Sequence, residues 1–80
     1  MNTDMIAYSI LKTEGDILFD MGFFDRAIKA YKTAKDFTDV WGPSFKKLKM
    51  RLYEQISVCY RVEHMYYIAI RYLKRALIMA

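Results

Sequence analysis

The stretch FDRAIKAYKTA (residues 24–34) places large and very small side chains on the same face of a predicted helix. Phe24, Ala27, Tyr31 and Ala34 recur at intervals of three and four residues, the spacing at which side chains share a helical face. A core helix usually fills that face with Leu, Ile and Val. Aromatic residues alternating with alanine instead predict a helix that a neighbouring helix approaches closely.

A second stretch, YYIAIRYLKRA (residues 66–76), repeats this pattern 42 residues later. Small residues align with small ones and large with large, both here and in the preceding helix, so the chain is predicted to hold two copies of one helix–turn–helix unit. The aligned pairs are Leu11 with Tyr53, Gly15 with Ser57, Leu18 with Tyr60, Phe24 with Tyr66, Ala27 with Ala69, Ile28 with Ile70, Tyr31 with Leu73, and Ala34 with Ala76.

Four helices are predicted, and no stretch shows the sustained alternation of a half-buried strand. Gly22 ends the first helix, because glycine tolerates the left-handed conformation after a helix. The segment TDVWGP is the one clear loop, and the break at His64 and Met65 contains no glycine. The helices are expected at about Asp4–Met21, Phe24–Phe37, Ser44–Glu63 and Tyr66 to the last residues.

The small residues are assigned to the places where helices meet. Gly15 and Ser57 are expected at the crossing within each pair, facing Ala27 and Ala69, while Ala34 and Ala76 are expected to face the next helix along. Ala30 lies off this stripe. Because overpacking a close contact costs about 1–3 kcal/mol, Ala27→Leu is predicted to lower the melting temperature more than Ala30→Leu.

Length and composition restrict the class of protein. A chain of 80 residues with 55% hydrophobic residues is expected to form one folded domain. Cys59 is the only cysteine, which excludes an internal disulfide and a zinc site built from cysteines. The N-terminus lacks the basic start and apolar block of a signal peptide. We therefore expect a cytoplasmic protein, in a cytoskeletal or other large assembly as an alternative.

Charge is divided unevenly along the chain. Residues 1–43 carry five Lys/Arg against seven Asp/Glu (−2), and residues 44–80 carry eight against two (+6), which together give the net charge of +4. The basic half is expected to lie beside an acidic neighbour, the first half of the chain included. Binding to nucleic acid or an acidic membrane is the alternative.

The sequence offers little for catalysis, and we expect neither an enzyme nor a bound metal or cofactor. Cys59 and His64 lie five residues apart, so on one helix they point in different directions. Asp16 and Asp20 share a face and are interpreted as a solvated acidic patch. The aromatic residues are assigned mainly to packing. Trp41, placed in the loop, is expected either to anchor a partner or to cover the end of the second helix.

Both copies resemble the tetratricopeptide repeat (TPR). In LKTEGDILFDMGFFDRAIKAYKTA the matching residues are Leu11, Gly15, Leu18, Gly22, Phe24, Ala27, Tyr31 and Ala34, and in YEQISVCYRVEHMYYIAIRYLKRA they are Tyr53, Ile56, Ser57, Tyr60, Tyr66, Ala69, Leu73 and Ala76. Glu14 and His64 depart from the family pattern, which usually has Leu and Gly there. The spacing of 42 exceeds the usual 34 residues, and FTDVWGPSFKKLK is expected to supply the extra length.

The resemblance implies an all-α fold: a right-handed α-solenoid segment of two antiparallel helical hairpins. The single domain, residues 1–80, then divides into repeat one (about 5–37), a loop (about 38–43) and repeat two (about 44–79). Two repeats are fewer than the roughly three that such arrays need, and terminal repeats normally carry a polar face. The apolar Leu77, Ile78 and Met79 therefore suggest a longer array or a docked subunit.

For function, the resemblance implies a non-catalytic scaffold that binds a peptide, helix or neighbouring subunit in a concave groove, and no small-molecule substrate. The first helix of each pair lines that groove. Lys12 fits a carboxylate-gripping subclass of the family, but Asp16 would repel a carboxylate, so a partner with apolar anchors is expected. The implied groove residues are Ser9, Lys12, Asp16, Phe19, Asp20, Arg51, Glu54, Gln55, Val58, Arg61 and Val62.

The alternative function is a basic helical module that binds RNA or an acidic membrane through residues 46–51 and 71–75. Salt dependence separates the two hypotheses. Affinity for nucleic acid falls steeply between low and moderate salt, whereas a peptide held by apolar contacts responds little.

Overall fold

A computed structural model describes residues 3–79 and shows a chain built of helices. The elements are α1 (Thr3–Asp20), α2 (Phe24–Trp41), the short 3₁₀ helix η1 (Pro43–Phe45), α3 (Lys46–Val62) and α4 (Tyr66–Met79). No strand occurs within residues 3–79. The predicted all-α class and the four helices are confirmed.

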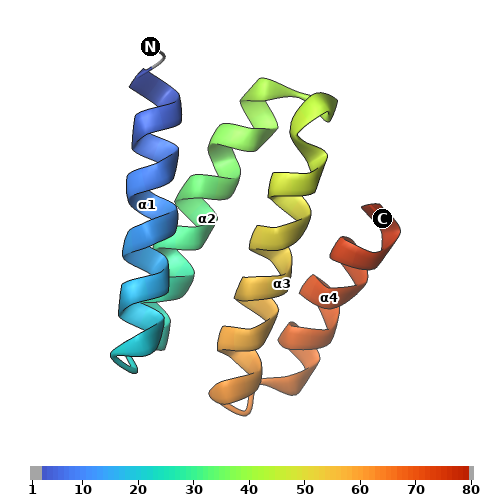
Figure 1. The fold of residues 1–80 in the computed structure, drawn as a ribbon. Coiled ribbons are helices and arrows are strands. Elements are labelled where there is room, and N and C mark those ends of the chain that lie inside the picture. Colours follow the sequence, from blue (N-terminus) through green and yellow to red (C-terminus); the bar gives the residue numbers. More distant parts are fainter. Residues whose placement is uncertain (1–2, 80) are drawn as a thin grey trace.

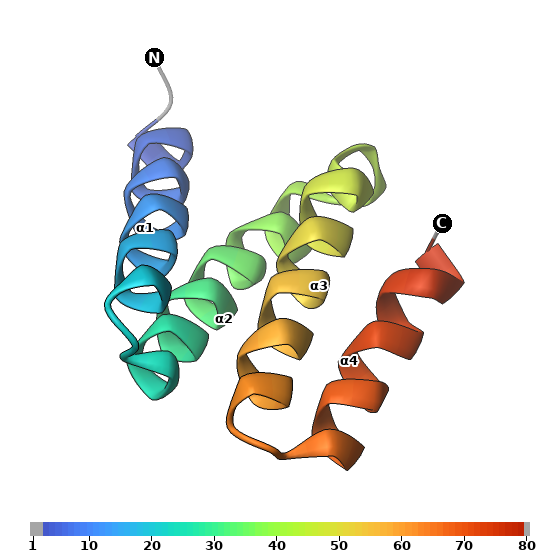
Figure 2. The same ribbon diagram turned by 60° about the horizontal axis from the view of Figure 1, so that its bottom comes forward.

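The helices pack mainly in sequence order, α1 against α2, α2 against α3 and α3 against α4 (Figure 1). Each helix runs antiparallel to the one before it, so the chain forms two helical hairpins that meet at the α2–α3 contact. Turning the molecule leaves α1 and α4 at its opposite edges (Figure 2). As a result, α2 and α3 each have neighbours on two sides, whereas α1 and α4 each have one outer side open.

The two hairpin turns have the same hydrogen-bond pattern, which explains why the second needs no glycine. Gly22 and His64 both take left-handed backbone angles, with φ of 85° and 64°. The Phe23 N–H donates to the Leu18 carbonyl at 2.8 Å, and the Met65 N–H donates to that of Tyr60 at 2.9 Å. Both are Schellman closures of a helix C-terminus, and His is one of the few side chains found with some frequency in this backbone region.

The connection between the hairpins differs from its prediction. Residues 38–41, which were expected to begin a loop, instead form the last turn of the 18-residue helix α2. Thr38 is buried, and its hydroxyl donates to the Lys35 carbonyl at 2.6 Å. Trp41 therefore ends the helix instead of lying in a loop, and only Gly42 separates it from η1. Within FTDVWGPSFKKLK, which was expected to supply the extra length between the copies, residues 37–41 belong to α2 and residues 46–49 to α3.

The smallest residues mark the helix crossings, as predicted. A Cβ atom added to Gly15 would lie 2.6 Å from Cε1 of Tyr31, so the ring of Tyr31 occupies the space that a side chain would need. At the equivalent place in the second hairpin, the Ser57 hydroxyl donates to the Ala69 carbonyl at 2.7 Å. Both contacts hold the two helices of a hairpin close together.

The predicted surroundings of two alanines are wrong. Ala76 is buried by the chain itself, so it lies within the second hairpin and does not face a further helix. Ala30 is also buried, although it was predicted to lie off the packing stripe. It lines a surface hollow between α1 and α2 with Leu11 and Leu18. The hollow leaves room for a larger side chain, unlike the surroundings of the fully buried Ala27.

Ala27→Leu is therefore still predicted to lower the melting temperature more than Ala30→Leu, but for a different reason. Ala27→Leu is expected to cost about 1–3 kcal/mol, because Leu must displace close neighbours. Ala30→Leu is expected to cost less, since its side chain enters the existing hollow. Thermal melts of both variants test this, and equal losses of melting temperature would show that the hollow does not accept the side chain.

Candidate partner-binding groove

A groove of about 270 Å³ lies between α1 and α3, the first helices of the two hairpins. It is lined by Tyr8, Lys12, Leu48, Arg51, Leu52, Glu54 and Gln55. Residues spaced by three and four positions on each helix bring these side chains to one side. Apolar side chains and a tyrosine ring therefore lie beside charged and amide groups, the arrangement that suits a partner with an apolar anchor.

Hydrogen bonds fix Asp16 beside the groove residue Lys12. The Lys12 ammonium donates to Asp16 at 3.0 Å, and the Tyr31 hydroxyl donates to the same carboxylate at 2.5 Å. Burial, and then this hydrogen bond, raise the pKa of Tyr31 well above its usual range. Asp16 is thus directed toward α2, while Arg51 makes no ion pair with any residue of the described chain.

Tyr8 joins the groove to a cluster of aromatic rings. Tyr8 packs against Trp41 with ring centroids 5.4 Å apart, and Trp41 also packs against Phe45 at 5.1 Å and Phe37 at 6.0 Å. This packing at the end of α2 agrees with one of the two roles predicted for Trp41, and its role as a partner anchor stays a prediction. Since Trp41 is the only tryptophan and contacts a groove residue, its fluorescence should report on groove occupancy.

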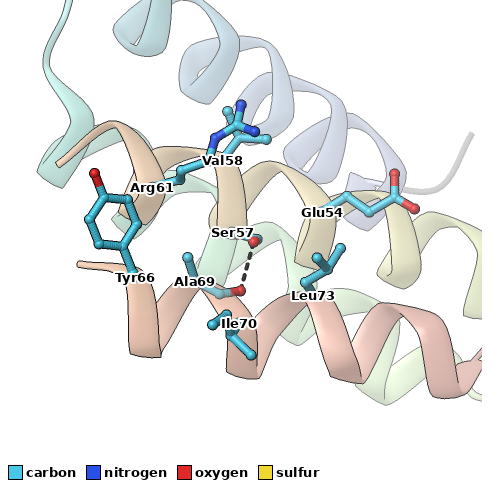
Figure 3. Close-up of a pocket in the computed structure, with 8 residues that line it drawn as sticks. All are labelled: Glu54, Ser57, Val58, Arg61, Tyr66, Ala69, Ile70 and Leu73. Atoms are coloured by element: carbon cyan, nitrogen blue, oxygen red, sulfur yellow. Dashed lines mark hydrogen bonds between the residues drawn. The ribbon is translucent and has the colours of Figure 1, made fainter. Parts of the chain in front are cut away.

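The predicted groove residues fall into several places. Lys12, Arg51, Glu54 and Gln55 come together between α1 and α3. Val58 and Arg61 line a different groove, between α3 and α4, to which Glu54 also contributes (Figure 3).

The other predicted residues line neither groove. Asp16 bonds toward α2, and Phe19 packs on Phe24 with ring centroids 5.3 Å apart. Ser9 lies on the outer side of α1. Asp20 and Val62 are exposed at the last residues of their helices.

Sequence reasoning missed Tyr8, Leu48 and Leu52, which supply the less polar part of the α1–α3 groove. Tyr8 precedes Lys12 by four residues, and Leu48 precedes Arg51 by three. Helical spacing alone therefore indicated that they share a side with predicted residues. They were missed because the family pattern assigns apolar positions to the core.

The second groove, of about 370 Å³, is lined by Glu54, Ser57, Val58, Arg61, Tyr66, Ala69, Ile70 and Leu73 (Figure 3). Its centre is the hydrogen bond from Ser57 to the Ala69 carbonyl. Ile70 and Leu73 are large and apolar, yet nearly half of each remains exposed. This groove opens at the α4 edge of the molecule, where no further helix lies.

Cys59 and His64 do not form a nucleophile pair. Cys59 is fully buried, and burial raises the pKa of its thiol to about 11. His64 lies exposed in the left-handed turn, with its Nδ1 2.8 Å from the Tyr66 hydroxyl. Cys59 thus belongs to the core.

Two carboxyl groups, Glu63 and Asp25, meet where α3 packs against α2. Oε1 of Glu63 is shielded from solvent and receives no hydrogen bond from a donor. Asp25, and to a lesser extent burial, raise the pKa of Glu63 above its usual value. The folded state therefore holds the proton on Glu63 more tightly than the unfolded state does. The stability that this proton contributes is fully present below the pKa of Glu63 in the unfolded chain, and it is lost as pH rises through the pKa in the folded chain.

Glu63→Gln should therefore raise the melting temperature near neutral pH and have little effect in acid. The amide resembles the protonated acid and can donate to Asp25 at every pH. Thermal melts from about pH 4 to about pH 7 test this, a range that begins near the ordinary pKa of Glu. Glu54→Gln is the matched control, and an equal gain at every pH would contradict the assignment.

The remaining charged contacts between the hairpins are favourable. Lys49 of α3 pairs with Asp39 of α2 and lowers the pKa of that carboxyl. The Lys32 ammonium donates to the Tyr60 hydroxyl at 3.0 Å and lies over the ring of Tyr72. Within the second hairpin, Arg75 lies over the rings of Tyr53 and Tyr72. Acidic and basic halves of the chain thus meet at α2–α3, as predicted.

Within residues 3–79, no helix has the length and apolar character needed to cross a bilayer, and no group of three or more His, Cys, Asp or Glu side chains is placed to hold a metal ion. Comparison of the chain with protein-family models, with curated proteins and with solved structures gave no match.

Proposed function

We propose that this protein is a non-catalytic scaffold whose α1–α3 groove binds a peptide or helix of a protein partner. The hairpins then form a segment of a right-handed, TPR-like α-solenoid, as the resemblance of both copies implies. The observation that carries the proposal is that Lys12, Arg51, Glu54 and Gln55, assigned to a binding groove from the sequence, line one groove beside Tyr8, Leu48 and Leu52.

The groove chemistry favours a ligand with an apolar anchor and an acidic group. Leu48 is only partly buried and offers apolar surface, and Arg51 offers a guanidinium that can form two parallel hydrogen bonds to a carboxylate. Lys12 already pairs with Asp16, so Arg51 is the better candidate to hold the acid. Such a ligand resembles the amphipathic segments that helical grooves commonly accept.

Selection of binders from a random peptide library tests the proposal. Peptides that carry an apolar residue near an acidic one should be enriched, and their binding should change Trp41 fluorescence. Arg51→Glu should weaken them at least about tenfold, because a hydrogen bond to a charged group contributes about 1.5–3 kcal/mol. Lys47→Glu is the control at an exposed position outside the groove. Enrichment of no peptide, or equal binding by both variants, would overturn the assignment.

The alternative function uses basic residues at the start of α3. Lys46 and Lys49 line a hollow with Met79, so the start of α3 lies beside the end of α4 and brings basic segments of both helices to one end. Lys49 is partly neutralised by Asp39, and Arg75 is held against tyrosine rings. Titration with a single-stranded RNA or anionic vesicles at low and moderate salt tests this function. Binding that falls steeply with salt would favour it over the groove.

A further inference from the structure

The two hairpins offer an internal comparison, because each residue of the first has a counterpart 42 residues later. Positions buried in both copies belong to the packing within a hairpin. Gly15 and Ser57 are such a pair, and so are Ala27 and Ala69. Positions buried in only one copy include those that the neighbouring hairpin covers.

Residues buried in only one copy differ strongly in exposed fraction from their counterparts. On α3, Leu52 is 1% exposed, whereas its counterpart on α1, Ile10, is 59% exposed. On α2, Ile28 is 6% exposed, whereas its counterpart on α4, Ile70, is 48% exposed. The further pairs of this kind are Ile56 with Glu14, Cys59 with Ile17, and Tyr31 with Leu73.

These open counterparts form two surfaces at opposite edges of the molecule. We name the first the α1 face, made of Ile10, Glu14, Ile17 and Met21, and the second the α4 face, made of Tyr67, Ile70 and Leu73. The α4 face adjoins the groove between α3 and α4 (Figure 3). In the chain itself, the equivalent surfaces of α3 and α2 are pressed against each other.

The two faces are more apolar than the internal contact that they resemble. The shielded carboxyl pair between α2 and α3, Asp25 and Glu63, has Tyr67 and Met21 as its counterparts. At the outer faces, two exposed apolar side chains thus take the place of the unfavourable carboxyl pair of the internal contact. Contiguous exposed apolar surface of this kind marks an interaction site.

We propose that copies of this chain stack end to end, with the α4 face of one copy covering the α1 face of the next in the register of the α2–α3 contact. The occupant of each face is thus a second copy of the same chain. In this register Ile10 and Ile17 take the places of the buried Leu52 and Cys59. The contact is heterologous and leaves a free face at each end, so it generates open chains of molecules.

Charge favours the contact between unlike ends. Residues 1–43 carry a net charge of −2 and residues 44–80 carry +6, so stacking α1 on α4 sets the acidic half beside the basic half. Glu14 of the α1 face then lies over a groove that Arg61 and Glu54 line. Contact between two α4 faces would instead bring two strongly basic halves together.

Two variants with one damaged face each test the stacking. Ile17→Lys places a positive charge opposite Arg61, and Leu73→Glu places a negative charge opposite Glu14. Both positions are exposed in the single chain, so the fold should be retained, as circular dichroism can verify. Val40→Lys, at an exposed position of α2, is the matched control.

Sedimentation from micromolar to millimolar concentration supplies the readout. The unmodified chain and the control should show an average mass that rises with concentration and does not stop at a dimer. Each face variant alone should be monomeric. An equimolar mixture of the two should form a heterodimer, because the intact α4 face of one meets the intact α1 face of the other.

Other outcomes would overturn the proposal. A chain that stays monomeric at every concentration excludes self-stacking and leaves the faces to a different partner. Dimerisation of Ile17→Lys alone would mean that like faces pair. The proposal does not depend on peptide binding in the α1–α3 groove, since Arg51→Glu should abolish that binding and leave stacking unchanged.

Discussion

Gly15→Ser is expected to destabilise the fold by about 1–3 kcal/mol, the usual cost of overpacking a close contact. The new Cβ atom would lie 2.6 Å from Cε1 and 2.8 Å from Cδ1 of Tyr31. The ring cannot easily move aside, because it is buried and its hydroxyl is bound to Asp16. The gain in helix propensity over glycine is under about 1 kcal/mol and does not offset this clash.

The second hairpin supplies the compensating change. Ser57 and Leu73 occupy the positions of Gly15 and Tyr31, so this chain already contains a serine paired with a side chain smaller than tyrosine. Tyr31→Leu alone should destabilise, because it removes the ring and its hydrogen bond. Combined with Gly15→Ser, it should relieve the clash.

A double-mutant cycle measured by denaturant unfolding checks this expectation. The double variant should be more stable than the sum of the single changes predicts, with a coupling energy of about 0.5–3 kcal/mol. Simple additivity would show that the ring does not limit the side chain at position 15. It would also mean that the two hairpins hold their helices together in different ways.

Leu52→Ala is expected to destabilise the fold by about 2–5 kcal/mol. Leu52 is 1% exposed and lies in the core cluster with Ile56 and Cys59, at the contact between the hairpins. Its truncation leaves a cavity between α2 and α3. Each kcal/mol lowers the melting temperature of a domain this small by about 4–8 °C, so thermal melts resolve the effect readily.

Ile10→Ala is the matched control, because Ile10 is the counterpart of Leu52 in the first hairpin. It is 59% exposed, so its truncation should leave the melting temperature of a dilute sample nearly unchanged. If copies stack as proposed, the same variant should weaken stacking at high concentration. A large loss of stability in dilute solution would show that Ile10 already packs within the single chain.

Much of the fold follows from local sequence rules. The spacing of apolar and small residues indicated the four helices, and Gly22 indicated the first turn. His64 gave a weaker signal, because a side chain in a left-handed turn depends on the hydrogen bonds that close the helix. The extension of α2 through Trp41 had no local signal, because it depends on aromatic packing with Tyr8 and Phe45.

The candidate groove was predictable only in part. Helical spacing placed Lys12 on one helix and Arg51 on another, but it could not show that the two helices lie across one groove. Nor could it separate Val58 and Arg61 from them, since those residues lie about two to three turns farther along α3 and line the groove shared with α4. Such distinctions depend on how the helices are rotated against each other.

The sequence by itself determined the helices, the two copies and the close crossings, because spacing and side-chain size act within one helix or one hairpin. Only the tertiary structure decided which of two equivalent residues, one in each hairpin, is buried. Ala34 and Ala76 are both buried, but Ile28 is covered while Ile70 is open. The reason is that burial between hairpins requires a neighbour, and only the first hairpin has one beside its second helix within the described chain.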